Sequence, residues 1–178
     1  MKPDEIRPIV EVVNSVEVQR KIYHHRARIW IEEGISPDLF EEGMHFDKYD
    51  LTSVHFAAFV DDNLAGSARL SIHSDVDDLP DRFIYDEVEL ELALPLVCMN
   101  RLIVEPAFRR RGLSGLLDSA RMNYAREHGC RSGLAYVERI EREQALIDLG
   151  FRVIATDIRT HRLTSNPMKV MVCGIDPR

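Results

Sequence analysis

The sequence predicts an α/β (α+β) fold, in which one domain is built on a mixed sheet with helices on both faces. Early in the chain, apolar runs at 54–60 and 64–73 are separated by Asp61-Asp62-Asn63, which is typical of a hairpin turn. From residue 96 onward, predicted strands alternate with predicted helices, which favours parallel pairing. The length of 178 residues suits a single domain with one core.

Hydrophobic periodicity and end signals place the individual elements. A helix is expected over 14–34, because apolar residues recur there at helical spacing and Gly34 suits its C-terminal end. The last helix is expected to turn Ile140 and Leu146 inward. The full set is helices at 14–34, 113–128 and 139–149, and strands at 54–60, 64–73, 96–104, 132–137, 151–158 and 168–175.

The segment from Ser74 to Leu92 is strongly acidic. It contains Arg82 as its one basic residue, against Asp75, Asp77, Asp78, Asp81, Asp86, Glu87, Glu89 and Glu91. Two interpretations stay open, a solvated loop or an acidic rim that attracts a cationic substrate.

Composition excludes several classes of protein. A net charge of −7 argues against wholesale binding to nucleic acid. The three cysteines are far apart and form no CxxC pair, so we expect neither a disulfide framework nor a zinc site, and the default compartment is a reducing cytoplasm. The charged start lacks a signal-peptide pattern, and the apolar run at 92–99 is far shorter than the roughly 20 residues that a membrane helix needs. The seven histidines form no metal motif, and His24 and His25 are expected to be solvated.

Functional signal concentrates between the 96–104 strand and the next helix. The run consists of Arg109, Arg110, Arg111, Gly112, Leu113, Ser114 and Gly115. Unpaired backbone N–H groups and the positive end of the helix dipole favour an anion at such a place, and glycine lets the backbone approach a phosphate closely. The spacing fits neither a P-loop nor a dinucleotide fingerprint.

The string LIVEPAFRRRGLSGLLDSA resembles motif A of the GNAT acyltransferase superfamily, through Leu102, Val104, Pro106, Arg109, Gly112 and Ser114. The later stretch from Ala145 to Phe151 resembles motif B of the same superfamily. The resemblance implies the GNAT fold, with a mixed sheet of about six to seven strands. Ser114 departs from the usual Gly or Ala, but its side chain is small.

The resemblance also implies roles for the matched positions. Backbone groups of Leu102, Ile103 and Val104 would bind the pantetheine of an acyl-coenzyme A (acyl-CoA), and the loop from Arg109 to Gly115 would hold its pyrophosphate. The coenzyme would be a co-substrate, and no metal is implied.

The N-terminal half is similar to the acyl-homoserine-lactone synthases and the related long-chain N-acyl amino acid synthases. The matching residues are Arg26, Arg28, Trp30, Asp47, Tyr49, Asp50, Ala68, Arg69, Leu70, Arg101, Leu102 and Val104. His45 stands where that branch usually has an acidic residue, and the branch's proline-threonine step is absent. The intact arginine–glycine loop favours coenzyme A over an acyl carrier protein as donor.

Candidate acid–base groups come from position along the chain. Leu146 stands where many GNAT members have a tyrosine acid. Tyr136 and Glu138, at the end of the 132–137 strand, are therefore catalytic candidates, as is Asn100, which could polarise the thioester carbonyl. Glu138 could instead cap the next helix, and Asn100 could be structural. Arg101 could pair with Asp47 or Asp50, or bind an acceptor carboxylate.

From the sequence we expect an N-acyltransferase that moves an acetyl group from acetyl-CoA to an amine by direct attack. A longer-chain N-acyl amino acid or homoserine-lactone synthase activity is the first alternative. A non-catalytic sensor that binds coenzyme A is the second, favoured by the missing tyrosine. The expected partner is a small-molecule amine, with no nucleic acid and no membrane span; many relatives are dimers, so a homodimer is compatible with this prediction.

Overall fold

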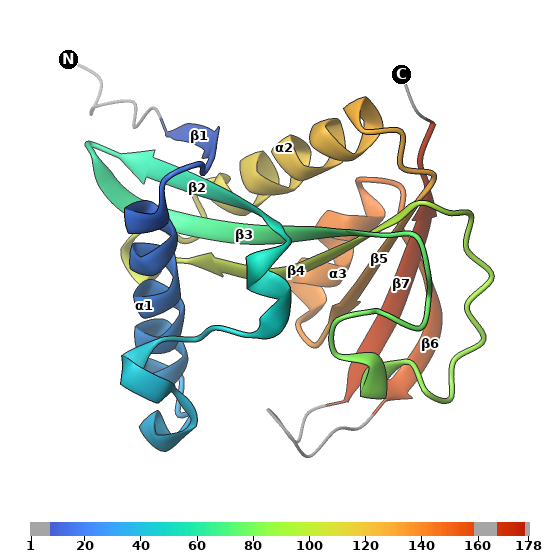
Figure 1. The fold of residues 1–178 in the computed structure, drawn as a ribbon, viewed down its shortest axis with the longest axis horizontal. Helices are drawn as coiled ribbons and strands as arrows, with labels where there is room; N and C mark the ends of the chain where they lie inside the picture. The colour runs from blue at the N-terminus through green and yellow to red at the C-terminus, as the bar shows by residue number, and fades with distance from the viewer. Residues whose placement is uncertain (1–7, 159–166, 177–178) are drawn as a thin grey trace. The chain divides into compact units, whose positions relative to one another are not determined.

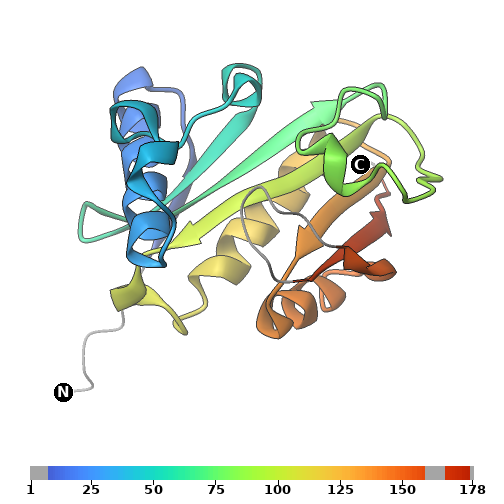
Figure 2. The ribbon, with the colours of Figure 1, turned by 90° about the horizontal axis from the view of Figure 1, so that it is seen from below.

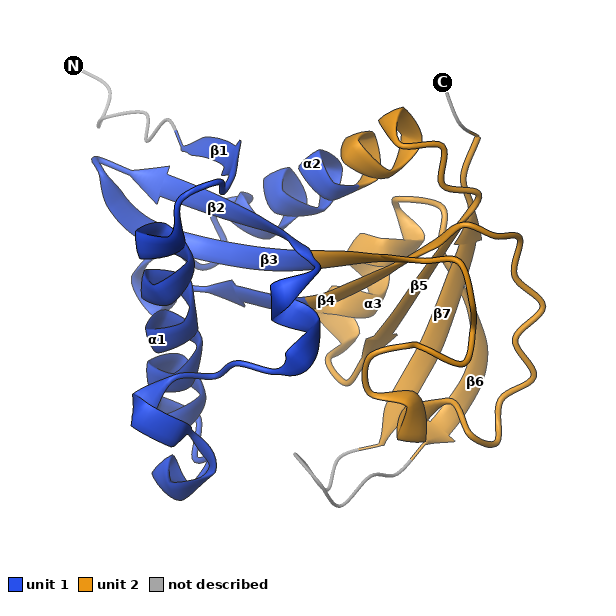
Figure 3. Ribbon diagram, viewed as in Figure 1, with its two compact units in different colours: residues 1–69, 101–121 blue, residues 70–100, 122–178 orange. Residues whose placement is uncertain are grey.

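The computed structural model describes residues 8–158 and 167–176. Within them, one mixed sheet has the strand order β1-β2-β3-β4-β5-β7-β6, with helices among the strands as predicted (Figure 1). Strand β4 (Leu96–Val104) pairs in parallel with β5 (Ser132–Val137). The chain divides into two compact units, residues 1–69 with 101–121 and residues 70–100 with 122–178 (Figure 3).

The first unit contains β1 (Ile9–Val12), α1 (Val16–Glu32), β2 (Val54–Val60) and most of β3 (Asn63–His73). Helix α1 begins at Ser15, whose side chain accepts a hydrogen bond from the Val18 N–H at 3.4 Å. It ends beside Gly34, which has a φ of 98°, as the end signal in the sequence indicated.

The predicted hairpin turn joins β2 to β3. Asp61 has a φ of 48° and Asp62 a φ of 61°, as a two-residue type I′ turn requires, so β3 begins one residue earlier than predicted, at Asn63. One face of β2 packs on α1 through a cluster that includes Ile22 and Ala57. Strand β1 pairs antiparallel with β2; no strand was predicted there.

Three short 3₁₀ turns lie between α1 and β2, at Pro37–Leu39, Glu41–Gly43 and Lys48–Leu51. They have too few residues for a hydrophobic period, and so the sequence did not indicate them. The third is held by a reciprocal capping box, in which the Asp47 side chain accepts from the Tyr49 N–H and the Asp50 side chain accepts from the Asp47 N–H.

The second unit contains β5, α3 (Ile140–Ile147), β6 (Arg152–Ile158) and β7 (Met168–Gly174). Strand β7 lies between β5 and β6 and is antiparallel to both. Helix α2 (Leu113–Glu127) is shared, with its first half in the first unit and its second half in the second. Leu146 of α3 is buried as expected, but Ile140 is 73% exposed because it is the first residue of that helix.

The acidic segment forms a strap, defined here as residues 75–92, over one face of the β5–β7–β6 part of the sheet, while α3 covers the other face (Figure 2). Its acidic side chains alternate with apolar ones that pack on Leu134, Val170 and Val172. Most of the acidic side chains are exposed, as the solvated-loop interpretation expected, while burial of the apolar ones fixes the strap to the sheet.

Among residues 8–158 and 167–176, no helix is both long enough and apolar enough to cross a bilayer.

Gly133 in β5 offers a direct test of packing in the second unit. A Cβ atom there would lie 2.8 Å from the Cys173 sulfur and 2.9 Å from the Phe151 ring, so Gly133→Ala should lower the free energy of unfolding by about 1–3 kcal/mol. The matched control is Gly174→Ala on β7, where a Cβ would meet nothing within 4 Å. Equal midpoints of urea unfolding for the two variants would contradict this packing.

Candidate functional site

The arginine–glycine loop connects the end of β4 to the start of α2 within the first unit. Arg110 (φ 59°) and Gly112 (φ 82°) both adopt left-handed backbone, which turns the chain sharply into the helix. The Arg109 N–H bonds to the Pro106 carbonyl and the Leu116 N–H to the Gly112 carbonyl. In the part of the chain that the structure describes, no backbone hydrogen bond uses the N–H groups between those two, from Arg110 to Gly115.

The space in front of this loop is open. A Cβ atom added at Gly112 or Gly115 would meet nothing within 4 Å. Several unpaired N–H groups therefore lie beside accessible space at a helix N-terminus, which is the arrangement that binds phosphate groups.

The arginines of the loop divide into two kinds. Arg109 turns back into the protein, where its Nε donates to the Val104 carbonyl at 3.1 Å and its guanidinium donates to Glu33 at 2.7 Å. Its side chain thus braces the loop against the end of α1. Arg110 and Arg111 are exposed, so their charges are available to an anion at the loop.

A buried ion-pair cluster lies in the same unit and joins α1, the 47–51 turn, β3 and β4. Arg26 donates to Asp50 at 2.7 Å, Arg69 donates to Asp47 at 2.6 Å, and Arg101 donates to Asp47 at 2.9 Å. Arg69 also lies 3.0 Å from the second Asp50 oxygen. The pairing of Arg101 with Asp47 is one of the alternatives that the sequence left open.

Arginine partners surround both carboxylates of this cluster. Asp47 pairs with Arg69 and Arg101, and Asp50 pairs with Arg26 and Arg69. Burial opposes ionisation of Asp47, but hydrogen bonds and charge from Arg69 and Arg101 outweigh it and hold the Asp47 pKa well below its usual range. Burial likewise opposes ionisation of Asp50, and there Arg26 and Arg69 lower the pKa.

The cluster also fixes an irregularity in β4. Arg101 has a φ of 53°, a left-handed conformation that is unfavourable for a non-glycine residue inside a strand. Its hydrogen bond to Asp47 holds it there. No glycine or proline marks this position, so the irregularity could not be predicted from the amino-acid pattern.

His45 lies beside the cluster, between the rings of Trp30 and Phe40 at centroid distances of 5.1 and 5.3 Å. Burial and the charges of Arg101 and Arg26 lower the His45 pKa to about 3, so the imidazole is neutral at pH 7. It faces a cavity of about 360 Å³ that is lined by Leu39, Glu41, Glu42, Met44, His45 and Phe46.

His25 corrects a sequence-based expectation. It was expected to be solvated, but it is only 7% exposed and its Nε2 lies 3.0 Å from a Glu105 oxygen. Arg28 pairs with the same Glu105 carboxylate. These contacts fix Glu105, the residue that follows β4, at the start of the loop. His24, by contrast, is exposed as expected.

The three catalytic candidates belong to the second unit. Pairing between β4 and β5 ends at Cys98 and Leu134, so Asn100 and Tyr136 each lie two residues beyond the last pair. Asn100 is buried, and the Tyr136 hydroxyl donates to Asp81 of the strap at 2.8 Å. Glu138 is exposed and precedes Arg139, the N-cap residue of α3.

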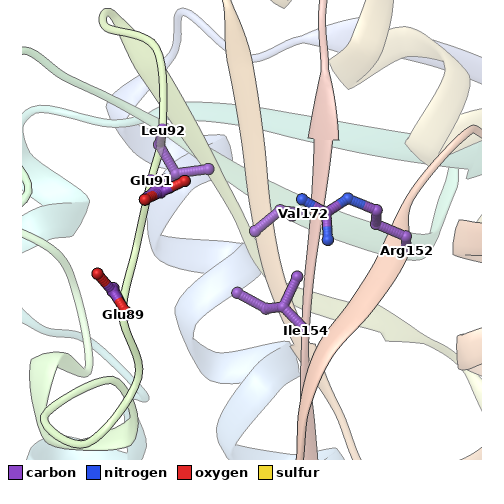
Figure 4. Close-up of a pocket in the computed structure, with 6 residues that line it drawn as sticks. All are labelled: Glu89, Glu91, Leu92, Arg152, Ile154 and Val172. Carbon is purple, nitrogen blue, oxygen red and sulfur yellow. The ribbon is translucent and has the colours of Figure 1, made fainter.

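A second cavity, of about 280 Å³, lies between the strap and the outer strands. Glu89 and Glu91 lie along the strap and Arg152 on β6, with Ile154 and Val172 between them (Figure 4). Acidic residues of the strap thus line one side of the hollow and a basic residue of β6 lines the other, with apolar side chains between them. Within the described ranges, no group of His, Cys, Asp and Glu is placed to hold a metal ion.

The depressed pKa of His45 predicts how stability depends on pH. In the unfolded chain His45 is protonated near pH 6.5, whereas in the folded chain it stays neutral until about pH 3. The free energy of unfolding therefore falls as the pH drops below 6.5. The slope is at most about 1.4 kcal/mol per pH unit for this group. Burial lowers the pKa values of His25 and His55 too, and both add to the slope with the same sign.

His45→Phe should therefore reduce the pH dependence between pH 6.5 and 4.5, measured by urea unfolding at several pH values. His24→Asn is the matched control, because His24 is exposed. If the free energy of unfolding depends on pH in His45→Phe as it does in the wild type, His45 is not a buried neutral imidazole.

Comparisons with known proteins bear on the whole chain. Residues 21–173 match the family model of the N-acyl amino acid synthase FeeM. No curated protein matches the sequence.

Several solved structures have the same fold. The CoA-dependent acyl-homoserine lactone synthase BjaI matches with a TM-score of 0.76 at 14% identity, over 95% of this chain and 84% of BjaI. FeeM itself, from uncultured soil microbes, has a TM-score of 0.68 at 15% identity, over 96% of this chain and 92% of FeeM. A GNAT-family acetyltransferase from Streptococcus pneumoniae has a TM-score of 0.69 at 12% identity, over 95% of this chain and 99% of that one.

At these identities the structures establish the fold, and the family model, which spans most of the chain, establishes the family. Both resemblances noted in the sequence are confirmed. The chain has the GNAT fold and belongs to the N-acyl amino acid synthase FeeM family of acyltransferases.

Proposed function

We propose that this protein transfers an acyl group from acyl-CoA to the amine of an amino acid or a similar carboxylate-bearing acceptor. The observation that carries the proposal is the run of unpaired N–H groups from Arg110 to Gly115, which faces open space in a chain of this family. Such a run suits the pyrophosphate of coenzyme A.

The donor would lie along the end of β4 and at the loop. Backbone groups of Leu102, Ile103 and Val104 would pair with the pantetheine amides, as one strand pairs with another. The loop N–H groups would bind the pyrophosphate, with the exposed Arg110 and Arg111 adding charge. Arg109 would act indirectly, because its guanidinium already bonds Val104 and Glu33.

Arg101 supports an acceptor with a carboxylate. It already pairs with a carboxylate of the protein, Asp47, and its guanidinium would bind an acceptor carboxylate in the same way, by hydrogen bonds between ionised groups, which are the stronger kind. The name of the matched family, N-acyl amino acid synthase, agrees with an acceptor of this class.

In the reaction, the neutral amine attacks the thioester carbon, the C–N bond forms, and the C–S bond breaks to release the coenzyme A thiolate. The Asn100 amide is proposed to polarise the thioester carbonyl. Glu138 is proposed to act before the attack, taking a proton from the incoming ammonium group directly or through water so that the amine becomes neutral. The buried Leu146 cannot serve as an acid, so the thiolate takes its proton from solvent.

Our first candidate is a donor chain longer than acetyl, because the sequence resembles the long-chain N-acyl amino acid synthases and the matched family is an N-acyl amino acid synthase. Acetyl transfer remains the second candidate, supported by the GNAT loop and by the acetyltransferase fold of the neighbour from Streptococcus pneumoniae. A coenzyme A sensor without turnover would bind the donor and release no thiol.

The loop assignment predicts the effect of a charge placed there. Gly112→Glu and Gly115→Glu should each weaken coenzyme A binding at least about a hundredfold, because the new carboxylate would repel the pyrophosphate and block its approach. Gly115→Glu avoids the strain that a side chain would meet at the positive φ of Gly112.

Calorimetric titration of coenzyme A measures these affinities, and Gly174→Glu is the control because Gly174 lies on β7, away from the loop in sequence. Unchanged affinity in both loop variants would rule out the assignment.

Donor length is tested by kcat/KM for acetyl-CoA and octanoyl-CoA with the same panel of amino acids, from thiol release and product mass. We expect octanoyl-CoA to be preferred by at least about tenfold, since each buried CH₂ group contributes about 0.8 kcal/mol. A preference for acetyl-CoA would select the acetyltransferase alternative. Tight coenzyme A binding with no thiol release from any donor would select the sensor.

A further inference from the structure

Asp81 makes an unusual contact for its place in the strap. It is the N-cap residue of the 3₁₀ turn Arg82–Ile84, where an aspartate commonly accepts a hydrogen bond from a backbone N–H of its own turn. The Asp81 side chain makes no such cap bond. Its Oδ2 instead accepts the Tyr136 hydroxyl at 2.8 Å.

The chain around Asp81 is built to hold this contact. Asp81 has a φ of 55°, a left-handed conformation that needs support from its surroundings. Leu79 and Ile84, on either side of it, are buried in the apolar cluster under the strap. The ring of Tyr85 packs edge-on against the Tyr136 ring at a centroid distance of 6.4 Å.

Tyr136 is equally well fixed. Its backbone pairs with Val170 of β7, and it lies on β5 two residues beyond the last pair with β4. Asn100 is at the corresponding point of β4. Tyr136 and Asn100 thus occupy corresponding positions on the two parallel strands, just beyond the point where their pairing ends.

The direction of the hydrogen bond decides what the phenol can do. A tyrosine has one O–H donor, and here Asp81 receives it. A phenol oxygen that donates its O–H keeps two lone pairs, and one of them would accept a hydrogen bond from an amine N–H.

We propose that Asp81 is a positioning residue that holds Tyr136 as the hydrogen-bond acceptor for the attacking amine. As the C–N bond forms and the C–S bond breaks, the amine proton passes to the phenol oxygen while the phenol proton passes to the Asp81 carboxylate. The thiolate leaves with the C–S bonding pair, and Asp81 later returns its proton to water. This inference rests on the proposed acyl transfer.

The test is a double-mutant cycle on Asp81 and Tyr136, with kcat and KM measured for one donor and one amine. Tyr136→Phe removes one hydroxyl and keeps the ring packed on Tyr85; it should lower kcat about a hundredfold, a typical contribution of a positioned proton acceptor. Asp81→Asn removes the negative charge and should lower kcat at least about tenfold. The KM for acyl-CoA should change less than about twofold in both variants, because neither group binds the donor.

Coupling between the two residues is the decisive readout. If Asp81 acts through Tyr136, the double variant loses about the same hundredfold as Tyr136→Phe alone, not the product of the two losses. Asp86→Asn is the matched control, since Asp86 is an exposed aspartate of the same strap that pairs with Arg82. It should leave kcat unchanged within twofold.

Three outcomes would overturn the inference while the acyl transfer itself stands: an unchanged kcat in Asp81→Asn, losses that multiply in the double variant, or an equal loss in Asp86→Asn. A wild-type protein that forms no N-acyl product with any donor and amine would instead overturn the proposed function, and this inference with it.

Discussion

The ion-pair cluster of Arg26, Asp47, Asp50, Arg69 and Arg101 is the constraint on which the first unit depends. Its members come from one helix, one 3₁₀ turn and two strands, so the cluster fixes these elements in one arrangement. Removing one partner of such a buried pair leaves an uncompensated charge and typically costs about 3–5 kcal/mol. The cluster also holds Arg101, the residue that follows Asn100 on β4, in left-handed backbone.

Much of the fold was predictable because it rests on local rules. The alternation of apolar residues marked the strands, Gly34 marked the end of α1, and Asp61-Asp62 marked the hairpin turn. The packing of the strap was not predicted, because its alternating apolar residues become evident only against the sheet that they cover. His25 was missed since its partner, Glu105, lies 80 residues away in the sequence.

The candidate site also has a part that could be predicted from local sequence and a part that could not. The loop was recognisable because its glycines and arginines are contiguous, and its geometry follows from a strand that runs directly into a helix. The contact between Tyr136 and Asp81 joins residues 55 positions apart, and no local sequence pattern predicts it. A structure is therefore needed to find the pair that we propose for proton transfer.

We propose above all that the acceptor bears a carboxylate, which pairs with a charged group of the protein. The most direct measurement is kcat/KM for an α-amino acid and for the amine that differs from it only by loss of the carboxylate, with the same acyl-CoA. A hydrogen-bonded charge pair contributes about 1.5–3 kcal/mol, so the amino acid should be preferred by at least about tenfold. Equal values for the two acceptors, or a preference for the amine without the carboxylate, would contradict this account.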